Sequence, residues 1–243
     1  MNVVAIIQAR MGSTRLRGKV LTDLGGQTVL ARVVSRVRRA TLVNSVVVAT
    51  TTEKNDDPIV YQCDQLEVDA FRGDEYDVLD RYYRAAQSKQ ATAIVRVTAD
   101  CPLIDPEVMD KTIRAFVNNQ PDYASNTLER TYPRGLDTEV AQFAALERAW
   151  RDARDTYQRV HVTPYLYQNP QLFKLLSVKG EKDYSQYRWT LDTTEDLEFL
   201  HAVFNRLQGQ NDVTWRAVVS LLQSEPELVE INNKVSQKSM HEG

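Results

Sequence analysis

Short runs of apolar, mostly β-branched residues alternate with amphipathic stretches along the first half of the chain. The apolar runs predict strands at residues 3–9, 45–51, 67–71 and 93–98. Between them, apolar residues recur at helical spacing in segments 28–40 and 77–90. Strands that alternate with helices build a parallel sheet covered on both faces. The pattern therefore predicts a three-layer α/β fold with a mostly parallel sheet.

The pattern changes after residue 122. A polar stretch leads into a helix near 143–154, so we expect 122–176 to form a small lobe inserted into the domain. A last strand near 187–191 and helices near 194–207 and 214–223 follow. A chain of 243 residues with 42% hydrophobic content can form one large domain or two small ones. We expect a single domain at 1–232, followed by a flexible polar tail at 233–243.

Aspartates mark the beginnings of several predicted helices. Asp57 and Asp105 each precede a proline. A carboxylate at the N-cap with proline at the first helical position is typical of a helix start. Asp196 and Glu195 are expected to complement the N-terminus of a later helix rather than to bind a ligand.

Composition gives no strong electrostatic character to the whole chain. The formal net charge of −3 and a pI near 5.7 favour neither nucleic acid nor an anionic membrane surface as a partner. Two cysteines are too few for a disulfide scaffold, and no apolar stretch approaches the roughly 20 residues of a membrane span. The chain also does not open on a charged segment followed by a long apolar run. We therefore expect a cytoplasmic protein that captures anions through local basic residues.

Glycine and basic residues are concentrated near the N-terminus. The glycines there are Gly12, Gly18, Gly25 and Gly26, and the cations are Arg10, Arg15, Arg17 and Lys19. Flexible backbone with free N–H groups, forked guanidinium donors and a lysine suit a triphosphate, although a solvated basic loop is the alternative. The spacing does not fit the Walker pattern, and the dinucleotide pattern G-x-G-x-x-G is absent. The absence disfavours a nicotinamide or flavin enzyme.

Six motifs in order resemble those of the cytidylyltransferases that make CMP-activated acidic sugars, such as CMP-Kdo and CMP-sialate synthetases. The motifs are IIQARMGSTRLRGKVL, FRGDEYDVLDRY, VRVTADCPLID, SNTLERTYPRGLDTEV, HVTPYLY and RWTLDTTEDL. The chain resembles in particular the SpsF-like branch of spore coat polysaccharide biosynthesis. The motifs span most of the chain, and their combination in this order is specific. One departure is Arg17, where the family has proline before the Gly-Lys pair.

The resemblance implies a Rossmann-like nucleotidyltransferase sheet of GT-A type and the activity of a CTP-dependent cytidylyltransferase. CMP would pass from CTP to an acidic sugar or a similar small acceptor, with release of pyrophosphate, in surface polysaccharide or glycoconjugate biosynthesis. The resemblance also implies a Mg²⁺ cofactor and a homodimer with the 122–176 lobe as its contact.

Two aspartates follow predicted strands, Asp100 after 93–98 and Asp192 after 187–191. Ligands of an open α/β sheet collect beyond the carboxyl ends of the strands, so we expect both carboxylates at the same rim. Mg²⁺ takes one or two carboxylates with phosphate oxygens and water, and the resemblance carries the role of metal ligand to both residues. Carboxylates ~4 Å apart repel by about 1 to 4 kcal/mol, so without a cation the pair should be destabilising. Arg15, Lys19, Asp100 and Asp192 form the predicted catalytic group.

The other site residues are predicted from the same segments. Nucleotide contacts are expected from Gln8, Ala9, Arg10, Gly12, Ser13, Arg15, Lys19 and Arg72. Acceptor contacts are expected from Tyr132, Arg134, Asp137, Glu139 and His161. For His161, a place on a helix surface or interface is the alternative. Trp189 and Tyr187 are expected in the core rather than against substrate.

The chemistry that suits these residues is positioning and charge neutralisation. Neither a zinc pattern nor a nucleophile elbow occurs in the sequence. In-line attack of an acceptor oxygen on the α-phosphorus of CTP needs alignment and charge neutralisation. Two other functions remain open. A glycosyltransferase that uses a nucleotide sugar commonly carries Asp-x-Asp, which is absent here. A nucleotide-binding protein without turnover has no need of both aspartates.

Overall fold

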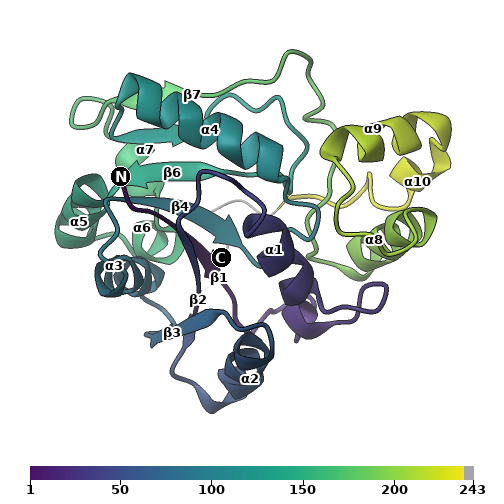
Figure 1. Cartoon of the computed structure of the whole chain (residues 1–243), viewed down its shortest axis with the longest axis horizontal. Helices are drawn as coiled ribbons and strands as arrows, with labels where there is room; N and C mark the ends of the chain where they lie inside the picture. The colour runs from purple at the N-terminus through teal and green to yellow at the C-terminus, as the bar shows by residue number, and fades with distance from the viewer. Residues whose placement is uncertain (238–243) are drawn as a thin grey trace.

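The computed structural model describes residues 1–237, which contain a seven-stranded sheet in the order β3-β2-β1-β4-β6-β5-β7 (Figure 1). The strands are β1 (Val3–Gln8), β2 (Ser45–Thr51), β3 (Asp69–Gly73), β4 (Ala93–Thr98), β5 (Tyr123–Ser125), β6 (Glu139–Gln142) and β7 (Leu175–Ser177). Every neighbouring pair is parallel except those of β6, which runs antiparallel to β4 and β5. The predicted mostly parallel α/β sheet is confirmed.

The central strand, β1, is apolar on both faces. It pairs in parallel with β2 on one side and with β4 on the other. Val3, Ala5 and Ile7 belong to the core on one face of the sheet, and Val4 and Ile6 belong to the core on the other. A continuous apolar run of this kind is typical of a strand whose two faces are both covered.

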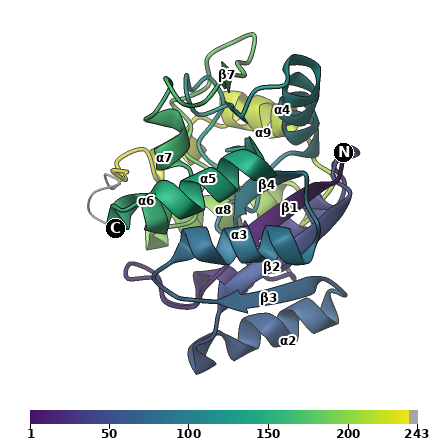
Figure 2. The same cartoon turned by 90° about the vertical axis from the view of Figure 1, so that its left-hand side faces the viewer.

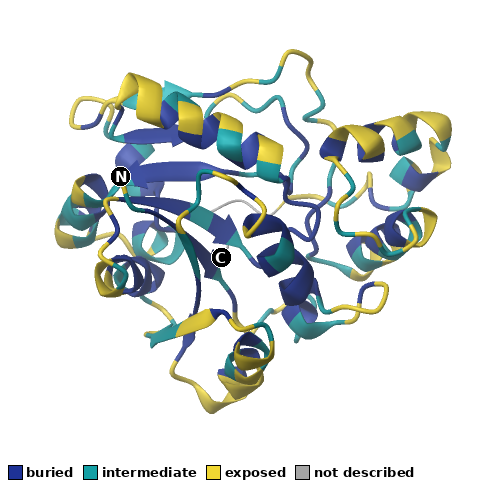
Figure 3. Cartoon of the chain, viewed as in Figure 1, coloured by how far each residue is buried: buried dark blue, intermediate teal, exposed yellow. Residues whose placement is uncertain are grey.

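Helices cover both faces of the sheet, as the two views in Figures 1 and 2 show. The core on one face takes residues from α1 (Val29–Val37), α2 (Asp57–Gln65) and α4 (Pro106–Asn119). The core on the other face takes residues from α3 (Val78–Ser88), α5 (Phe143–Asp152) and α7 (Pro164–Tyr167), and α6 (Thr156–His161) packs beside α3. Figure 3 shows the strands mostly buried between these helices. The three predicted layers are therefore present.

A third apolar cluster joins the C-terminal helices to the rest of the domain. The helices are α8 (Thr194–Arg206), α9 (Trp215–Ser224) and α10 (Glu227–Glu230), which lie to the right of the sheet in Figure 1. They pack around Leu24, Trp189 and Leu191. Trp189 is fully buried and Tyr187 packs against the same cluster, as predicted for both. The 187–191 segment is therefore packed against the C-terminal helices.

Segment 122–176 does not form an inserted lobe. Its strands, β5, β6 and β7, belong to the main sheet, and α5 and α7 belong to the core on one face. Tyr123 and Ala141, which pair across β5 and β6, are buried. The polar stretch that suggested a separate lobe is the loop at 126–138 between these two strands. Its polarity reflects a place at the rim of the sheet rather than a new unit.

Residues 187–191 were predicted as a strand, but they form only one isolated bridge, between Arg134 and Arg188. The backbone N–H of Trp189 donates to the carbonyl of Arg134 at 2.7 Å, and that of Leu191 donates to the carbonyl of Asp100 at 2.8 Å. Gly135 has φ of +110°, and a Cβ there would lie 2.8 Å from the carbonyl carbon of Trp189. The apolar pattern in 187–191 therefore reflects burial against the C-terminal helices and the Gly135 turn, not pairing in the sheet.

The predicted helix starts are correct for two aspartates and displaced for a third. The side chain of Asp105 accepts from two backbone N–H groups of α4, and Asp196 forms a capping box at the start of α8. Asp57, predicted as an N-cap, is instead the first residue of α2, and Asp56 stands at the N-cap without a side-chain cap bond. Asp56 accepts from the backbone N–H of Met11 at 2.7 Å, so it anchors the loop after β1 instead.

The C-terminal segment contacts the domain up to the end of the described residues. Asn232 is buried, and its Nδ2 donates to Asp196 Oδ1 and to the carbonyl of Arg188, each at 3.0 Å. Gln237 Oε1 accepts from Arg188 Nη1 at 2.7 Å. The flexible tail predicted at 233–243 therefore includes residues that lie against the domain, while 238–243 fall outside the described residues.

Candidate active site

A cavity of about 440 Å³ opens at the carboxyl ends of β1 and β4. Its walls come from the loop after β1, the residues after β4, the loop between β5 and β6, and the segment before α8. The predicted site residues that line it are Gln8, Ala9, Arg10, Ser13, Arg15, Lys19, Asp100, Arg134, Asp137, His161 and Asp192. Because ligands of open α/β sheets bind at this rim, the cavity is the candidate active site.

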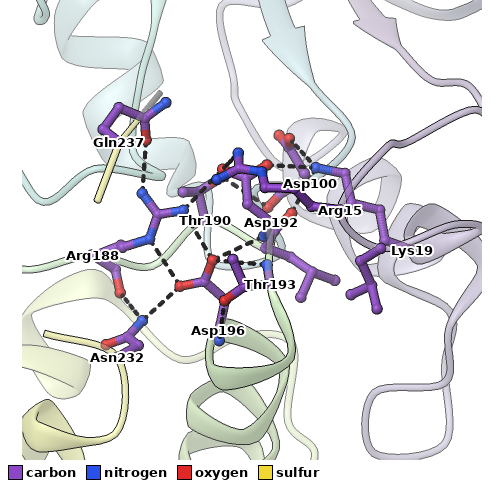
Figure 4. Close-up of polar contacts among 12 residues, drawn as sticks. Arg15, Lys19, Asp100, Arg188, Thr190, Asp192, Thr193, Asp196, Asn232 and Gln237 are labelled. Atoms are coloured by element: carbon purple, nitrogen blue, oxygen red, sulfur yellow. Dashed lines mark hydrogen bonds and ion pairs between the residues drawn. The ribbon is translucent and has the colours of Figure 1, made fainter. Parts of the chain in front are cut away.

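Lys19 connects the two aspartates that were predicted to share a cation. Its Nζ donates to Asp100 Oδ2 at 2.8 Å, to Asp192 Oδ1 at 2.8 Å and to the carbonyl of Leu191 at 2.7 Å (Figure 4). Lys19 begins the short helix η1, whereas the aspartates follow β4 and precede α8. The fold therefore brings three distant segments of the chain to one point at the base of the cavity.

The charges of this group are mutually stabilised. Burial by itself lowers the pKa of Lys19, but the charges of Asp100 and Asp192 outweigh it and raise the pKa above its usual value. Burial likewise raises the pKa of Asp100, but the charge and hydrogen bond of Lys19 outweigh it, so the pKa is lowered. The cation without which the two carboxylates were expected to destabilise each other is therefore the ammonium group of Lys19.

Arg15 extends the same group toward the cavity mouth. Its Nη2 lies 2.9 Å from Asp192 Oδ2, on the carboxylate oxygen that Lys19 does not contact. Arg15 and Lys19 both come from the basic segment that was predicted to hold a triphosphate, and both line the cavity. The predicted catalytic group of Arg15, Lys19, Asp100 and Asp192 is thus assembled in one place.

The loop between β1 and η1 is closed by its own backbone. The carbonyl of Met11 accepts from the N–H groups of Ser13 at 2.9 Å and Gly18 at 3.0 Å. Gly18 has φ of +68°, a left-handed conformation that favours glycine, and it immediately precedes Lys19. Arg17, which stands where the resembled family has proline, is exposed and does not line the cavity. The lysine is therefore positioned by the glycine turn, and Arg17 adds a charge outside the site.

The structure adds cavity residues that the sequence did not single out. The polar ones are Thr14, Arg81, Arg96, Thr98, Thr190 and Gln237. Arg81 is 1% exposed on α3, its Nη1 donates to the carbonyl of Asp74, and its Nε has no hydrogen-bond partner among residues 1–237. The periodicity of its motif, FRGDEYDVLDRY, indicates only a helix packed on the sheet.

Arg72, predicted to contact the nucleotide, does not line the cavity. Its Nη1 lies 2.7 Å from Asp57 Oδ1, and its Nε donates to the carbonyl of Thr51 at 2.8 Å. These contacts hold Arg72, on the edge strand β3, against the end of β2 and the start of α2. Gly12, also predicted, does not line the cavity either, because the closed loop turns it toward Glu75.

On the acceptor side, three of the five predicted residues line the cavity, namely Arg134, Asp137 and His161. Burial raises the pKa of Asp137, but its two-pronged contact with Arg130, at 2.5 and 2.8 Å, outweighs burial and lowers the pKa. Burial and the nearby charge of Arg130 lower the pKa of Arg134. Among residues 1–237 the guanidinium of Arg134 has no ion-pair partner, so this charge faces the cavity.

Tyr132 and Glu139 lie away from the cavity, contrary to prediction. Tyr132 is buried in the third apolar cluster, with its ring edge against Trp215. Glu139 is buried on β6, where it pairs with Arg96 and accepts from Thr163. Since Arg96 lines the cavity, Glu139 fixes a cavity residue without reaching the ligand itself. The pattern TYPRGLDTEV does not indicate which of its polar residues face the cavity.

The two aspartates suit a magnesium ion. Asp100 and Asp192 both lie 2.8 Å from one nitrogen, so their carboxylates already converge on a single cation. Mg²⁺ takes one or two carboxylates and completes its coordination with phosphate oxygens and water. Within residues 1–237, no three His, Cys, Asp or Glu side chains are grouped so as to hold a metal on their own. A metal at these aspartates would therefore share its coordination with a phosphate ligand.

No helix within residues 1–237 has the length and apolar character needed to cross a membrane. The family model described as Cytidylyltransferase matches residues 4–222. An uncharacterized protein of Methanocaldococcus jannaschii is 39% identical over 100% of this chain and 99% of its own. The spore coat polysaccharide biosynthesis protein SpsF of Bacillus subtilis is 34% identical over 93% of this chain and 96% of its own.

Further relatives extend the comparison to a solved structure and to a more distant group. A cytidylyltransferase from Leptospira borgpetersenii serovar Hardjo-bovis has a TM-score of 0.91 and 33% identity, covering 98% of this chain and 100% of its own. The 3-deoxy-manno-octulosonate cytidylyltransferase of Trichlorobacter lovleyi is 37% identical over 53% of this chain and 50% of its own. The likeness thus spans the whole fold and every segment that lines the cavity.

Proposed function

Because the chain belongs to the cytidylyltransferase family and is a CTP-dependent nucleotidyltransferase, we propose that it transfers CMP from CTP to an acidic sugar or a similar small acceptor. The acceptor oxygen attacks the α-phosphorus of CTP in line with the leaving group, the bond between the α-phosphorus and the bridging oxygen breaks, and pyrophosphate leaves. The family leaves no support for the glycosyltransferase alternative.

The observation that carries the proposal is the group of Arg15, Lys19, Asp100 and Asp192 at the base of the cavity. Two cations from a glycine-rich loop and two carboxylates meet at the carboxyl ends of β1 and β4. Phosphoryl-group transfer requires little from the protein beyond alignment and charge neutralisation, and this group supplies both. Arg15 and Lys19 are the residues that would contact the triphosphate.

Asp100 and Asp192 are the residues that would hold Mg²⁺. When bound there, the ion supplies positive charge that neutralises the triphosphate. For the triphosphate to bind, Lys19 and Arg15 exchange part of their contact with the carboxylates for contact with phosphate oxygens. Each cation then keeps an anionic partner throughout the exchange.

An acceptor carboxylate fits Arg134 in the cavity lining. Arg134 presents a guanidinium whose burial makes it poorly solvated, and such a group binds a carboxylate through paired N–H donors. Asp137 and His161 also line the cavity and offer polar partners for hydroxyl groups. The SpsF and 3-deoxy-manno-octulosonate cytidylyltransferase relatives support an acidic sugar and a role in surface polysaccharide biosynthesis.

The experiment that tests this function is a screen of acceptors with CTP and magnesium, in which the CMP adduct is detected by mass spectrometry. The panel contains acidic sugars and their uncharged reduced counterparts. An adduct with acidic sugars and none with the reduced counterparts supports the proposal. Adducts formed equally well with both would contradict the role of an acceptor carboxylate. We also propose a homodimer, which sedimentation at micromolar concentration would refute by showing monomer alone.

A further inference from the structure

Arg188 lies behind the active site and uses all three of its guanidinium nitrogens (Figure 4). Nη2 donates to Asp192 Oδ2 at 2.9 Å, and Nε and Nη2 donate to the two oxygens of Asp196 at 2.8 and 2.9 Å. Nη1 donates to Gln237 Oε1 at 2.7 Å. The guanidinium plane is therefore fixed on three sides, and one of those sides is a carboxylate of the active site.

Asp196 holds the Arg188 guanidinium in place. Its side chain is fully buried, and Oδ2 also accepts from the backbone N–H groups of Asp192 at 2.9 Å and Thr193 at 3.2 Å. Asp196 thus caps α8 and binds Arg188 with the same carboxylate. A buried two-pronged contact between arginine and carboxylate is costly to break from one side. The contact with Asp196 therefore holds the Arg188 guanidinium in place beside Asp192.

The three cations around Asp192 differ in whether they line the cavity. Arg15 and Lys19 come from the loop after β1, and both face the cavity where phosphates would bind. Arg188 comes from the segment of Asp192 itself, does not line the cavity and is held by Asp196. It shares Oδ2 of Asp192 with Arg15, and Oδ1 accepts from Lys19.

From this geometry we propose that Arg188 is a positioning residue for Asp192, and that it connects the C-terminal segment to the active site. The proposal rests on the proposed function, because the consequence of positioning Asp192 is read through magnesium and CTP. When Lys19 and Arg15 turn to phosphate, Arg188 remains in contact with Asp192 Oδ2 and keeps the carboxylate oriented with Oδ1 toward the metal position.

The C-terminal segment completes the arrangement. Asn232 donates from one amide nitrogen to Asp196 Oδ1 and to the backbone carbonyl of Arg188, each at 3.0 Å, and Gln237 both accepts from Arg188 and lines the cavity. The chain that follows α10 therefore returns to the 188–196 segment and forms part of the cavity wall. Residues that the sequence predicts as a tail support the position of Asp192 instead.

The test compares Arg188→Met, Arg188→Lys and Gln237→Ala with wild type. Arg206→Met is the matched control, because Arg206 is exposed on α8 and pairs with Glu225 at 3.0 Å, away from the cavity. Three quantities are measured: the Kd for CTP with magnesium by calorimetry, the magnesium concentration for half-maximal rate, and kcat. Melting temperatures of all variants separate a folding defect from a defect at the site.

Partners that orient a metal ligand typically contribute 10- to 100-fold in metal affinity or activity. We expect Arg188→Met to raise the magnesium requirement and lower kcat by roughly 10- to 100-fold. Arg188→Lys keeps the positive charge but lacks the forked donors of a guanidinium, so its changes in magnesium requirement and kcat should be intermediate. Gln237→Ala should change the same quantities in the same direction by less, and Arg206→Met should match wild type.

Wild-type kinetics and CTP binding in either Arg188 variant would overturn the positioning role, and wild-type values in Gln237→Ala would overturn the part assigned to the C-terminal segment. If Arg188→Met fails to fold, Arg188→Lys decides the question. Failure of the proposed function looks different. Wild-type protein would then bind no CTP and form no adduct with any acceptor, whatever the residue at position 188.

Discussion

Lys19 Nζ lies 2.8 Å from Asp100 Oδ2, although the two residues stand 81 positions apart in the chain. The same nitrogen contacts Asp192 at the same distance, so one lysine connects the loop after β1 with both carboxylates. A group that would bind phosphate is thus paired with the groups that would bind metal. We therefore expect nucleotide and metal to bind together. Phosphate would draw Lys19 away from the two carboxylates, and the carboxylates would then be available to the metal.

Asp100→Asn and Asp192→Asn test the carboxylates directly. Each variant removes one of two proposed metal ligands and leaves Lys19 a carboxylate and a backbone carbonyl as partners. Charge neutralisation by a metal supplies several kcal/mol to such reactions, so we expect kcat to fall by at least roughly 10³-fold. Circular dichroism should show an unchanged fold. A rate within tenfold of wild type for either variant would exclude the shared metal site.

Lys19→Ala and Arg15→Ala test the basic loop. Losing a well-placed charge donor in a phosphoryl transfer should cost roughly 10² to 10³ in kcat/KM. Arg17→Ala is the matched control, since Arg17 belongs to the same loop, is exposed and does not line the cavity. Initial rates at several CTP concentrations give the comparison. Equal losses in Arg17→Ala and Lys19→Ala would indicate that the loop attracts the nucleotide only through its overall charge.

Magnesium alone should leave the melting temperature nearly unchanged, because Lys19 already neutralises the carboxylate pair. Magnesium with CTP should stabilise the protein. At a ligand concentration 100 times Kd the expected gain is about 2.7 kcal/mol, which corresponds to roughly 5 to 10 °C for a chain of this size. The melting temperature is measured with magnesium alone, with CTP and EDTA, and with CTP and magnesium together. A large shift with magnesium alone would mean that Lys19 does not occupy the position between the aspartates.

Both thiols should be unreactive in the folded protein. Burial raises the pKa of Cys63 to about 12, and burial, with the charge of Asp100, raises the pKa of Cys101 well above its usual value. The thiolate is the reactive form, so at about pH 8 neither side chain should react with Ellman's reagent. After denaturation two thiols should react. A thiol that reacts rapidly in the native protein would contradict the burial of these residues.

Much of the fold follows from local patterns. The run from Val3 to Ile7 predicts a central strand because its apolar residues cover both faces, and Asp105 before proline predicts a helix start because its carboxylate caps two N–H groups. The 187–191 segment misled because deep burial against helices produces the same apolar signature as burial in a sheet. Trp189 is buried as predicted, but for a reason other than strand pairing.

The site was predictable where motifs and strand ends coincide, as for Lys19 and Asp100. The direction of a side chain within a motif was not predictable. Arg72 and Arg81 stand nine positions apart, and only the folded structure shows that Arg72 pairs with Asp57 whereas Arg81 lines the cavity. Gln237 could not be found at all, because its role depends on where the chain returns after α10.

Base choice tests the central claim that this cavity performs a CTP-dependent transfer. Cytosine presents an exocyclic amino donor and an unprotonated ring N3, so polar groups placed for cytosine meet mismatched partners in uracil. Leaving buried polar groups unpaired costs about 1 to 3 kcal/mol each, which predicts a ten- to hundredfold preference over UTP. Purines should be poorer still, because they overfill a site built for a pyrimidine.

The decisive measurement is the initial rate of pyrophosphate release with CTP, UTP, ATP and GTP, each with magnesium and one working acceptor. The same assay on Lys19→Ala shows whether the release occurs at this cavity. We expect the highest rate with CTP, a ten- to hundredfold lower rate with UTP, and the lowest rates with ATP and GTP. Equal rates with CTP and a purine triphosphate, or full release by Lys19→Ala, would contradict a CTP-dependent transfer at this cavity.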